Sequence, residues 1–380
     1  MAGQSLQKYI DLRSGEFAYN KGNSISYPCG CVFRLKGYHS AAVPFVYFCF
    51  AVQEDVAEPA YLEQFFAGGG LNAQLKGRIN SGVRNNGLLN IRAGEFFSCV
   101  VPLPPVQEQR KIAAILSSVD EAIEGTQAVI DQLQVVKKAM MADLLTRGIP
   151  GRHSKFKQTE IGEVPEEWEV GSISSFVEEM RGGSPLTPSD FVEEGFTVLH
   201  KGDILPDGIV QLAPNSSRYA STSFAEGHQR SVIDSNFLVA TLRDLVPSGP
   251  SIGLISRVPQ DRNLRLLLAQ GAYGLRLDAN SMDPDYLIAV SNSAFYRQAA
   301  RRIAVGSTQI HIRNGDFLAL RIPIPSPEER RTIGQAIAAF SALLSEERRT
   351  IGGLRALKTG LMDDLLTGRR RVCVEQNNGQ

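Results

Sequence analysis

The segment VPLPPVQEQR at residues 101–110 recurs as IPIPSPEERR at residues 322–331, and the rest of the chain is organised around this repeat. The two copies begin 221 positions apart, at residues 101 and 322. They keep this offset as far as MADLLT at 141–146 and MDDLLT at 362–367. Gapless agreement over such a length indicates a duplication. The duplicated unit consists of a globular part, a proline-rich segment and a helix.

The segment that follows each proline-rich entry is typical of a long helix. Prolines 102, 104 and 105 exclude a helix there, because each fixes φ and removes a hydrogen-bond donor. No proline follows between Val106 and Leu145, and Pro327, which suits a first helical turn, opens a second such segment that reaches Leu366. Each helix would span on the order of 60 Å at a rise of about 1.5 Å per residue.

Both segments carry apolar residues at alternating spacings of three and four, which is the pattern of a heptad seam. Thr126 and Glu347 interrupt the two seams at equivalent positions, as do Lys137 and Lys358. We expect the seams to pair as an antiparallel coiled coil within the chain; the alternatives are two ordinary amphipathic core helices, or pairing between two chains. The predicted seam residues are Ile112, Leu116, Val119, Ile123, Ile130, Leu133, Met140, Leu144, Ile333, Ile337, Phe340, Leu344, Ile351, Leu354, Leu361 and Leu365.

The domain order follows from the repeat, and the fold class that it predicts is α+β. Two globular α/β domains would be separated by two long antiparallel helices forming an intramolecular coiled coil. The predicted order is a first globular domain, a helical spacer, a linker, a second domain, a second spacer and a tail, at residues 1–100, 101–148, 149–164, 165–321, 322–368 and 369–380.

Within the second domain, short apolar runs at 197–200, 236–242 and 252–255 predict strands, and residues 283 to about 302 predict a helix. The preceding stretch from 148 to 157 combines a Gly/Pro stop with basic residues, and we interpret it as a solvated linker rather than a contact to DNA.

Basic and polar residues recur in the second domain at turns, where they suit contacts with nucleic acid. Arginine fits the O6/N7 edge of guanine, glutamine fits adenine, and Lys, Ser or Thr can hold phosphates. Lys+Arg and Asp+Glu both number 40, and a net charge of zero counts against a simple polyanion binder. The candidate DNA contacts in this domain are Arg181, Lys201, Arg218, Arg243, Ser307, Thr308, Gln309 and His311.

Several site classes find no support in the sequence. The five cysteines lack the spacing of a disulfide framework or a zinc site, and the five histidines are scattered without a nucleophile, base and orienting group. There is no Gly-x-x-x-x-Gly-Lys-Ser/Thr phosphate loop and no Asn/Asp-Pro-Pro-Tyr/Phe motif. We therefore expect no catalytic residues and no metal. No apolar run reaches a membrane-spanning length, so we expect a cytoplasmic protein.

Four features together resemble the specificity subunits of Type I restriction–modification systems. They are the doubled Pro-x-Pro entry, the Asp-Leu-Leu-Thr exits at 143–146 and 364–367, the spacer TEIGEVPEEW at 159–168, and RGGSP at 181–185 followed by KGDI at 201–204. The resemblance implies two target-recognition domains that each read half of a bipartite double-stranded DNA site, and it adds Lys21 of the first domain to the DNA-contact candidates.

The resemblance also implies partners. The paired helices would set the spacing of the half-sites and dock modification subunits, which hold S-adenosylmethionine and methylate adenine. Separate restriction subunits would translocate and cut DNA. This chain would bind no cofactor of its own.

The first domain departs from the family pattern. The second domain has about 150 residues before its helix and the first about 100, and the Trp-led opening has no counterpart upstream of Gly15. We therefore expect a first domain shortened at its N-terminus. Two other interpretations remain open: an inactive or reserve copy of such a subunit, and a coiled-coil scaffold that binds only proteins.

Overall fold

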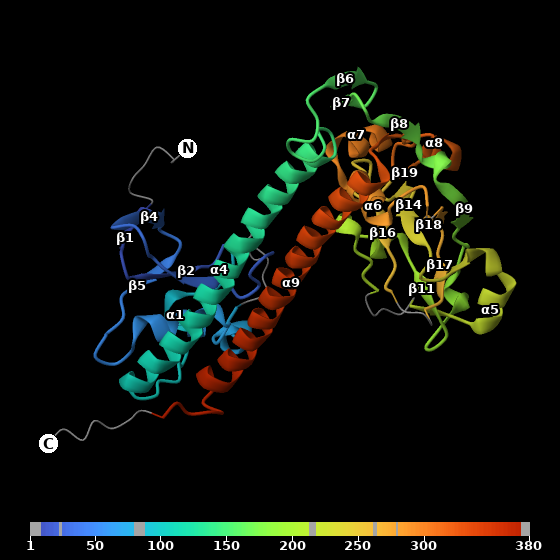
Figure 1. Ribbon diagram of the computed structural model, residues 1–380. Coiled ribbons are helices and arrows are strands. Elements are labelled where there is room, and N and C mark those ends of the chain that lie inside the picture. The colour runs from blue at the N-terminus through green and yellow to red at the C-terminus, as the bar shows by residue number, and fades with distance from the viewer. Residues whose placement is uncertain are drawn as a thin grey trace. The chain divides into compact units, whose positions relative to one another are not determined.

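The computed structural model describes residues 9–22, 25–79, 88–212, 218–260, 264–278 and 280–373. It divides into two compact units, unit 1 with Met1–Val129 and Arg348–Gln380, and unit 2 with Ile130–Glu347. Two long helices, α4 (Val106–Leu144) and α9 (Pro327–Leu366), run through this division (Figure 1). Each unit therefore holds one globular part and one half of each helix. Residues 374–380 of the expected tail lie outside the described residues.

The globular part of unit 1 is built on short antiparallel strands. A three-stranded sheet has the order β3 (Cys31–Arg34), β2 (Phe17–Asn20), β5 (Phe48–Phe50). A separate ladder pairs β1 (Tyr9–Arg13) with β4 (Ser40–Pro44). The central strand β2 is the most buried, because its residues pack against aromatic side chains on both neighbouring strands and on the helices.

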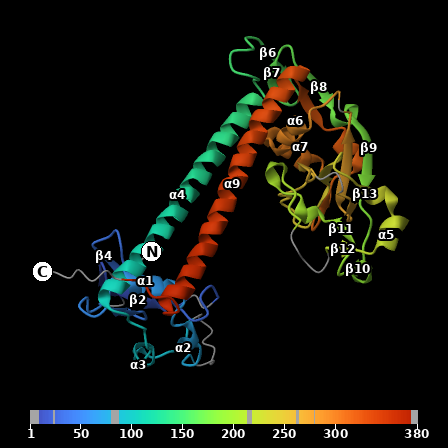
Figure 2. The ribbon, with the colours of Figure 1, turned by 60° about the horizontal axis from the view of Figure 1, so that its bottom comes forward.

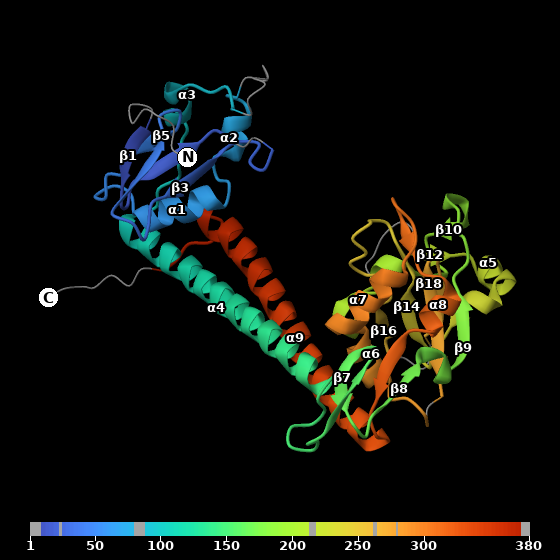
Figure 3. The same cartoon turned by 90° about the horizontal axis from the view of Figure 1, so that it is seen from above.

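Three short helices complete this part of unit 1: α1 (Pro59–Ala67), α2 (Asn72–Lys76) and α3 (Ala93–Phe97). Tyr19 of β2 stacks on Phe96 of α3 with ring centroids 4.4 Å apart. Within this unit α1 lies against the first turns of α4 and the last turns of α9 (Figure 3). Ile112, Leu116, Leu365 and Leu366 from the two helices thus join the same apolar core as the sheet.

Unit 2 contains two larger sheets. One has the order β16 (Ile255–Arg257), β14 (Leu238–Thr241), β18 (Ala272–Leu277), β9 (Val177–Gly182), and all its pairings are antiparallel. The other is mixed and lies beside α5 (Thr222–Gly227) (Figure 2). Its order is β10 (Phe191–Val192), β12 (Tyr219–Ala220), β11 (Phe196–Leu199), β17 (Leu266–Leu268), β13 (Val232–Ile233).

Three smaller ladders complete the strands of unit 2. They pair β6 (Phe156–Thr159) with β7 (Gly162–Pro165), β8 (Glu169–Ser172) with β20 (Arg321–Ile324), and β15 (Arg243–Asp244) with β19 (Ile310–His311). The mixture of helix and sheet confirms the predicted α+β class. The strand predicted at 252–255 is wrong in its position along the sequence, because residues 251–253 form a turn and β16 begins only at Ile255.

The helix predicted from 283 to about 302 is two helices, α6 (Pro284–Asn292) and α7 (Ala294–Ile303). The break lies at Ser293, which has an extended backbone. Its hydroxyl caps α7 by accepting a hydrogen bond from the Tyr296 N–H. Serine favours such caps over helix interiors. A short α8 (Asn314–Leu318) then leads into β20 and α9.

The two long helices contact each other in antiparallel order within each unit. In unit 1, Lys358 of α9 reaches Asp120 of α4 at 2.5 Å. In unit 2, Lys137 of α4 donates to Ser341 of α9 at 2.7 Å. All sixteen predicted seam residues are buried or half-buried, which is the burial that the heptad spacing requires.

The duplication extends to individual hydrogen bonds. The Tyr61 hydroxyl in α1 donates to the Pro102 carbonyl at 2.9 Å, and the Tyr286 hydroxyl in α6 donates to the Pro323 carbonyl at 3.1 Å. Both long helices are also followed by a glycine with positive φ, at Gly148 and Gly368, where other residues would be strained. Each unit therefore attaches its globular part to the helices by the same contacts.

Candidate nucleic-acid interface

The β15–β19 ladder brings most of the predicted DNA contacts of unit 2 together. Arg243 of β15 lies opposite His311 of β19. Residues 305–311 form a tight hairpin, in which Val305 and His311 exchange two backbone hydrogen bonds of 2.9 Å. Its turn needs Gly306, with φ of +117°, because a Cβ there would lie 2.1 Å from the Gln309 carbonyl oxygen. The exposed residues of this hairpin include Ser307, Thr308, Gln309 and His311.

Lys201 joins this group from another part of the sequence. It lies in the 3-10 helix η4 (Lys201–Asp203), and its stem and that of Arg243 flank the backbone of Gly271. Burial lowers the pKa of the Lys201 amine; Asp244 opposes that shift and Arg243 adds to it. Two cationic side chains thus lie beside the polar hairpin.

The loop 245–250 borders the same ladder and is held at both ends. The Asp244 carboxylate accepts from the Ser251 hydroxyl at 2.8 Å and from the Val246 N–H at 3.2 Å. Burial alone would raise the pKa of Asp244, but these hydrogen bonds outweigh it and lower the pKa. Arg297 of α7 donates to the carbonyls of Gly249, Pro250 and Ile252. The fixed loop exposes two apolar side chains, Leu245 (58% exposed) and Val246 (44% exposed).

Arg181, on β9, has other partners. Its guanidinium donates to Glu179 at 2.7 Å and to the Val232 carbonyl, and it lies over the Phe237 ring at 4.8 Å. Arg276 shares the same carboxylate and the same ring. The hydrogen bond from Arg181 lowers the pKa of Glu179. These contacts give Arg181 a structural part in the sheet.

Arg218 is buried, so it does not offer its guanidinium to a base. It makes two hydrogen bonds to the Asp203 carboxylate, at 2.9 and 3.1 Å, and a third to the Val198 carbonyl at 2.6 Å. The sequence could not reveal this, because neither the spacing nor the neighbours of Arg218 signal burial. Lys21 belongs to unit 1, where its ammonium lies 4.8 Å from the centre of the Phe48 ring.

The linker expected to be solvated contains a buried polar cluster. The His153 side chain is 3% exposed, and its two ring nitrogens lie 2.9 Å from Glu167 and from Glu329. Glu329, in the repeated motif, also accepts from the Trp168 indole and the Ile149 N–H, both at 3.1 Å. Glu329 thus serves as a shared hydrogen-bond acceptor for the linker and for the segment that contains Trp168.

The equivalent residue of unit 1, Glu108, binds the segment after α9. Arg371 donates to it through Nε at 2.8 Å and Nη2 at 2.6 Å, and the Val372 N–H donates at 3.1 Å. The hydrogen bond from Arg371 lowers the pKa of this carboxyl. In both units the chain that leaves one long helix is therefore tied to the start of the other.

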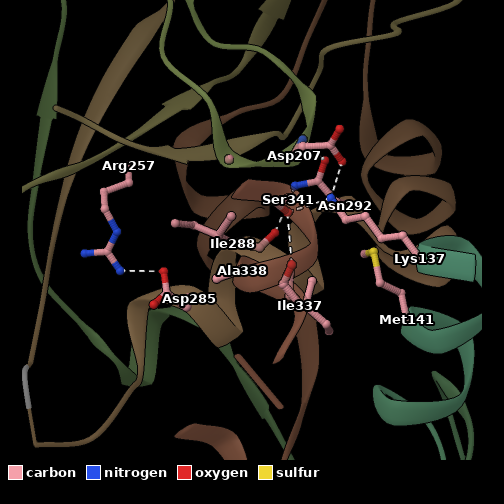
Figure 4. A pocket seen from close by; sticks show the side chains of 12 residues that line it. Lys137, Met141, Asp207, Arg257, Asp285, Ile288, Asn292, Ile337, Ala338 and Ser341 are labelled. Carbon is pink, nitrogen blue, oxygen red and sulfur yellow. Dashed lines mark hydrogen bonds and ion pairs between the residues drawn. The ribbon is translucent and has the colours of Figure 1, made fainter. Parts of the chain in front are cut away.

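The lysines that interrupt the two seams have acidic partners that the sequence did not reveal. Lys137 reaches Asp207 at 2.6 Å and Ser341 at 2.7 Å, beside a cavity of about 170 Å³ (Figure 4). Asp207 lies in the 3-10 helix η5 (Pro206–Gly208) with a φ of +69°. In unit 1 the partner of Lys358 is Asp120, which also accepts from Gln64 at 2.8 Å.

We predict that Lys137→Met lowers the free energy of unfolding of unit 2 by roughly 1–3 kcal/mol, because Asp207 and Ser341 lose a charge-assisted partner. The Lys137 side chain is 5% exposed, whereas that of Lys358 is 21% exposed. Lys358→Met, the matched control, should therefore cost unit 1 only about 0–1 kcal/mol. Urea unfolding followed by the fluorescence of Trp168, the only tryptophan, reports on unit 2, and circular dichroism follows the whole chain. A larger loss in Lys358→Met would contradict this ranking.

Within the described ranges, no helix is both long and apolar enough to cross a membrane. The same residues contain no group of three or more His, Cys, Asp or Glu side chains arranged to hold a metal ion.

Comparisons with known proteins agree on one family. Residues 14–135 match the family model described as Type I restriction modification DNA specificity domain. Two relatives come from Methanocaldococcus jannaschii: the Type I restriction enzyme MjaVIII specificity subunit is 26% identical over 77% of this chain, and the putative MjaX specificity subunit is 27% identical over 72%. The chain spans 67% and 59% of the lengths of these relatives.

A solved structure supports the same fold. The S subunit of a Type I restriction–modification system from M. genitalium superposes with a TM-score of 0.60 at 12% identity, covering 96% of this chain and 85% of that one. The likeness of fold adds to the sequence matches and to the internal repeat. Residues 14–135 thus match the DNA specificity domain of Type I restriction–modification systems, and the chain is similar in sequence to the specificity subunits of such systems.

Proposed function

We propose that this chain is the non-catalytic, sequence-specific DNA-binding subunit of a Type I restriction–modification complex. The observation that carries the proposal is the convergence of Lys201, Arg243 and the exposed hairpin 305–311 at one ladder of unit 2. Cationic side chains contact phosphates, or guanine in the case of arginine, and the Gln309 amide suits adenine. A rigid turn that presents such groups limits the entropy lost on binding.

The two units and their shared helices suit a bipartite site. Each unit would read one half-site, and joining two readers raises the effective concentration of the second when the spacing fits. The helices would also dock modification subunits carrying S-adenosylmethionine, with restriction subunits in the complete assembly. We infer a cytoplasmic location and no cofactor for this chain.

The proposal is tested by mapping adenine methylation in cells that carry the cognate modification subunit with wild-type chain, Arg243→Ala or Gln309→Ala. Each variant should relax or weaken recognition at one base pair, by roughly 1–3 kcal/mol for a direct contact. Arg265→Ala is the matched control, because Arg265 is an exposed arginine of unit 2 outside the β15–β19 ladder. An unchanged motif in both test variants would remove this surface from DNA reading, and absence of any motif that depends on the chain would refute the function itself.

A further inference from the structure

The strand edge before α9 is fully paired in unit 2. β20 pairs antiparallel with β8, with Ile322 opposite Gly171 and Pro323 opposite Val170, and the Ile173 N–H donates to the Leu320 carbonyl at 3.1 Å. Main-chain groups of an antiparallel strand face the same neighbour at every second residue. The main-chain N–H and carbonyl groups of Leu320, Ile322 and Ile324 therefore face β8. The carbonyl of Pro323 faces the other way and accepts a hydrogen bond from the Tyr286 hydroxyl.

The equivalent segment of unit 1 is paired on only one side. The offset of 221 places Val101 and Leu103 at the positions of Ile322 and Ile324. The Val100 N–H and carbonyl bond to the Gln74 side chain at 2.9 and 2.7 Å, and the Pro102 carbonyl accepts from Tyr61. Among the residues that the structure describes, none pairs with the main chain of Val101 or Leu103. The edge that β8 covers in unit 2 thus has no main-chain partner among the described residues of unit 1.

The side chains around this edge are unusually apolar for an exposed surface. Phe97, Val100 and Leu103 are 55%, 72% and 44% exposed. Val101 is only half-buried, whereas its counterpart Ile322 is fully buried under β8. An unpaired apolar edge of this kind is a template for an added strand.

A cavity lies on one face of the same edge. It has a volume of about 760 Å³, and its lining includes Val100, Pro102, Phe65, Met362 and Leu366, all from unit 1. Residues directly opposite each other in an antiparallel pair point to the same face. The residue opposite Pro102 in an added strand, equivalent to Val170, would therefore point to the face that the cavity occupies.

We propose that the Val101–Leu103 edge of unit 1 binds an extended segment of a second polypeptide as an antiparallel strand. The segment has the pattern of Val164–Ile173: main-chain groups for the edge, an aliphatic side chain opposite Pro102, and a tryptophan two residues before it. Main-chain hydrogen bonds give such β-addition its affinity, and the pocket gives it selectivity. This interaction is independent of DNA recognition.

The test is the binding of a fluorescent peptide with the sequence of residues 164–176 to the full chain, measured by anisotropy. We expect saturable binding that weakens at least about tenfold when the peptide is N-methylated at Gly171, which removes a donor facing Val101. N-methylation at Val170, whose N–H faces away from the edge, is the matched control and should change the affinity less than about threefold.

Variants of the protein separate the proposed edge from other surfaces. Leu103→Asp should weaken binding at least about tenfold, whereas Val135→Asp, at a 64% exposed residue of α4, should leave it unchanged. Absence of saturable binding to the folded chain, or equal losses from the two N-methylated peptides, would overturn the proposal. So would sedimentation of the free chain as a dimer that Leu103→Asp dissociates, because a second copy would then be the occupant.

Discussion

Glu329→Ala should lower the free energy of unfolding of unit 2 by roughly 3–5 kcal/mol, the range found when one partner of a buried charged cluster is removed. The Glu329 side chain is 2% exposed and lies between the linker and the start of the second domain. Its removal leaves the Trp168 indole, the Ile149 N–H and one ring nitrogen of His153 without their acceptor. Buried donors left in this state account for most of the expected loss.

Glu108→Ala is the control, because Glu108 occupies the same position in the first copy of the motif. Its partner Arg371 is 66% exposed and returns to water when the carboxylate is lost. We expect a smaller loss for this variant, of about 1–2 kcal/mol. Urea unfolding with Trp168 fluorescence and circular dichroism measures both variants. Equal losses of unfolding free energy in the two variants would mean that burial of the hydrogen-bond partners does not determine the size of the loss.

The helical part of the fold was predictable because its signals are local. Prolines 102, 104 and 105 mark the entry to α4, and the heptad spacing marks the face that is buried. Because the two segments are copies of each other, the prediction for α4 applies equally to α9, which begins at Pro327 and ends at Leu366 as the repeat predicts. Tyr61 and Tyr286 lie in the echoing segments PAYL at 59–62 and PDYL at 284–287, which belong to the same duplication. The echo does not show that the two hydroxyls bind the carbonyls of Pro102 and Pro323.

The DNA-contact candidates were predictable only in part, because the sequence gives the chemistry of a side chain but not its exposure. Gln309 and His311 lie in a polar turn beside a glycine, and such turns are exposed. Asp207, by contrast, is separated from Lys137 by 70 positions, and no periodic pattern connects them. Long-range ion pairs of this kind depend on tertiary packing alone.

Arg218→Ala should destabilise unit 2 by roughly 3–5 kcal/mol, although sequence reasoning placed this arginine among the DNA contacts. The Arg218 and Asp203 side chains are 4% and 9% exposed, so the substitution leaves a buried carboxylate without its bidentate partner. Arg218→Lys should recover only part of the loss, because an ammonium cannot reproduce the planar fork.

A double variant distinguishes an arginine that stabilises the fold from an arginine that contacts DNA bases. Replacing a buried ion pair by apolar residues of similar volume is often neutral for stability. Arg218→Met combined with Asp203→Leu should therefore be more stable than Arg218→Ala in urea unfolding, and it should leave the methylated motif unchanged. Arg243→Ala should show the reverse, with stability within about 0.5 kcal/mol of wild type and an altered motif. A stable Arg218→Ala protein with a relaxed motif would return Arg218 to the DNA interface, because its guanidinium would then have to leave Asp203 in order to read a base.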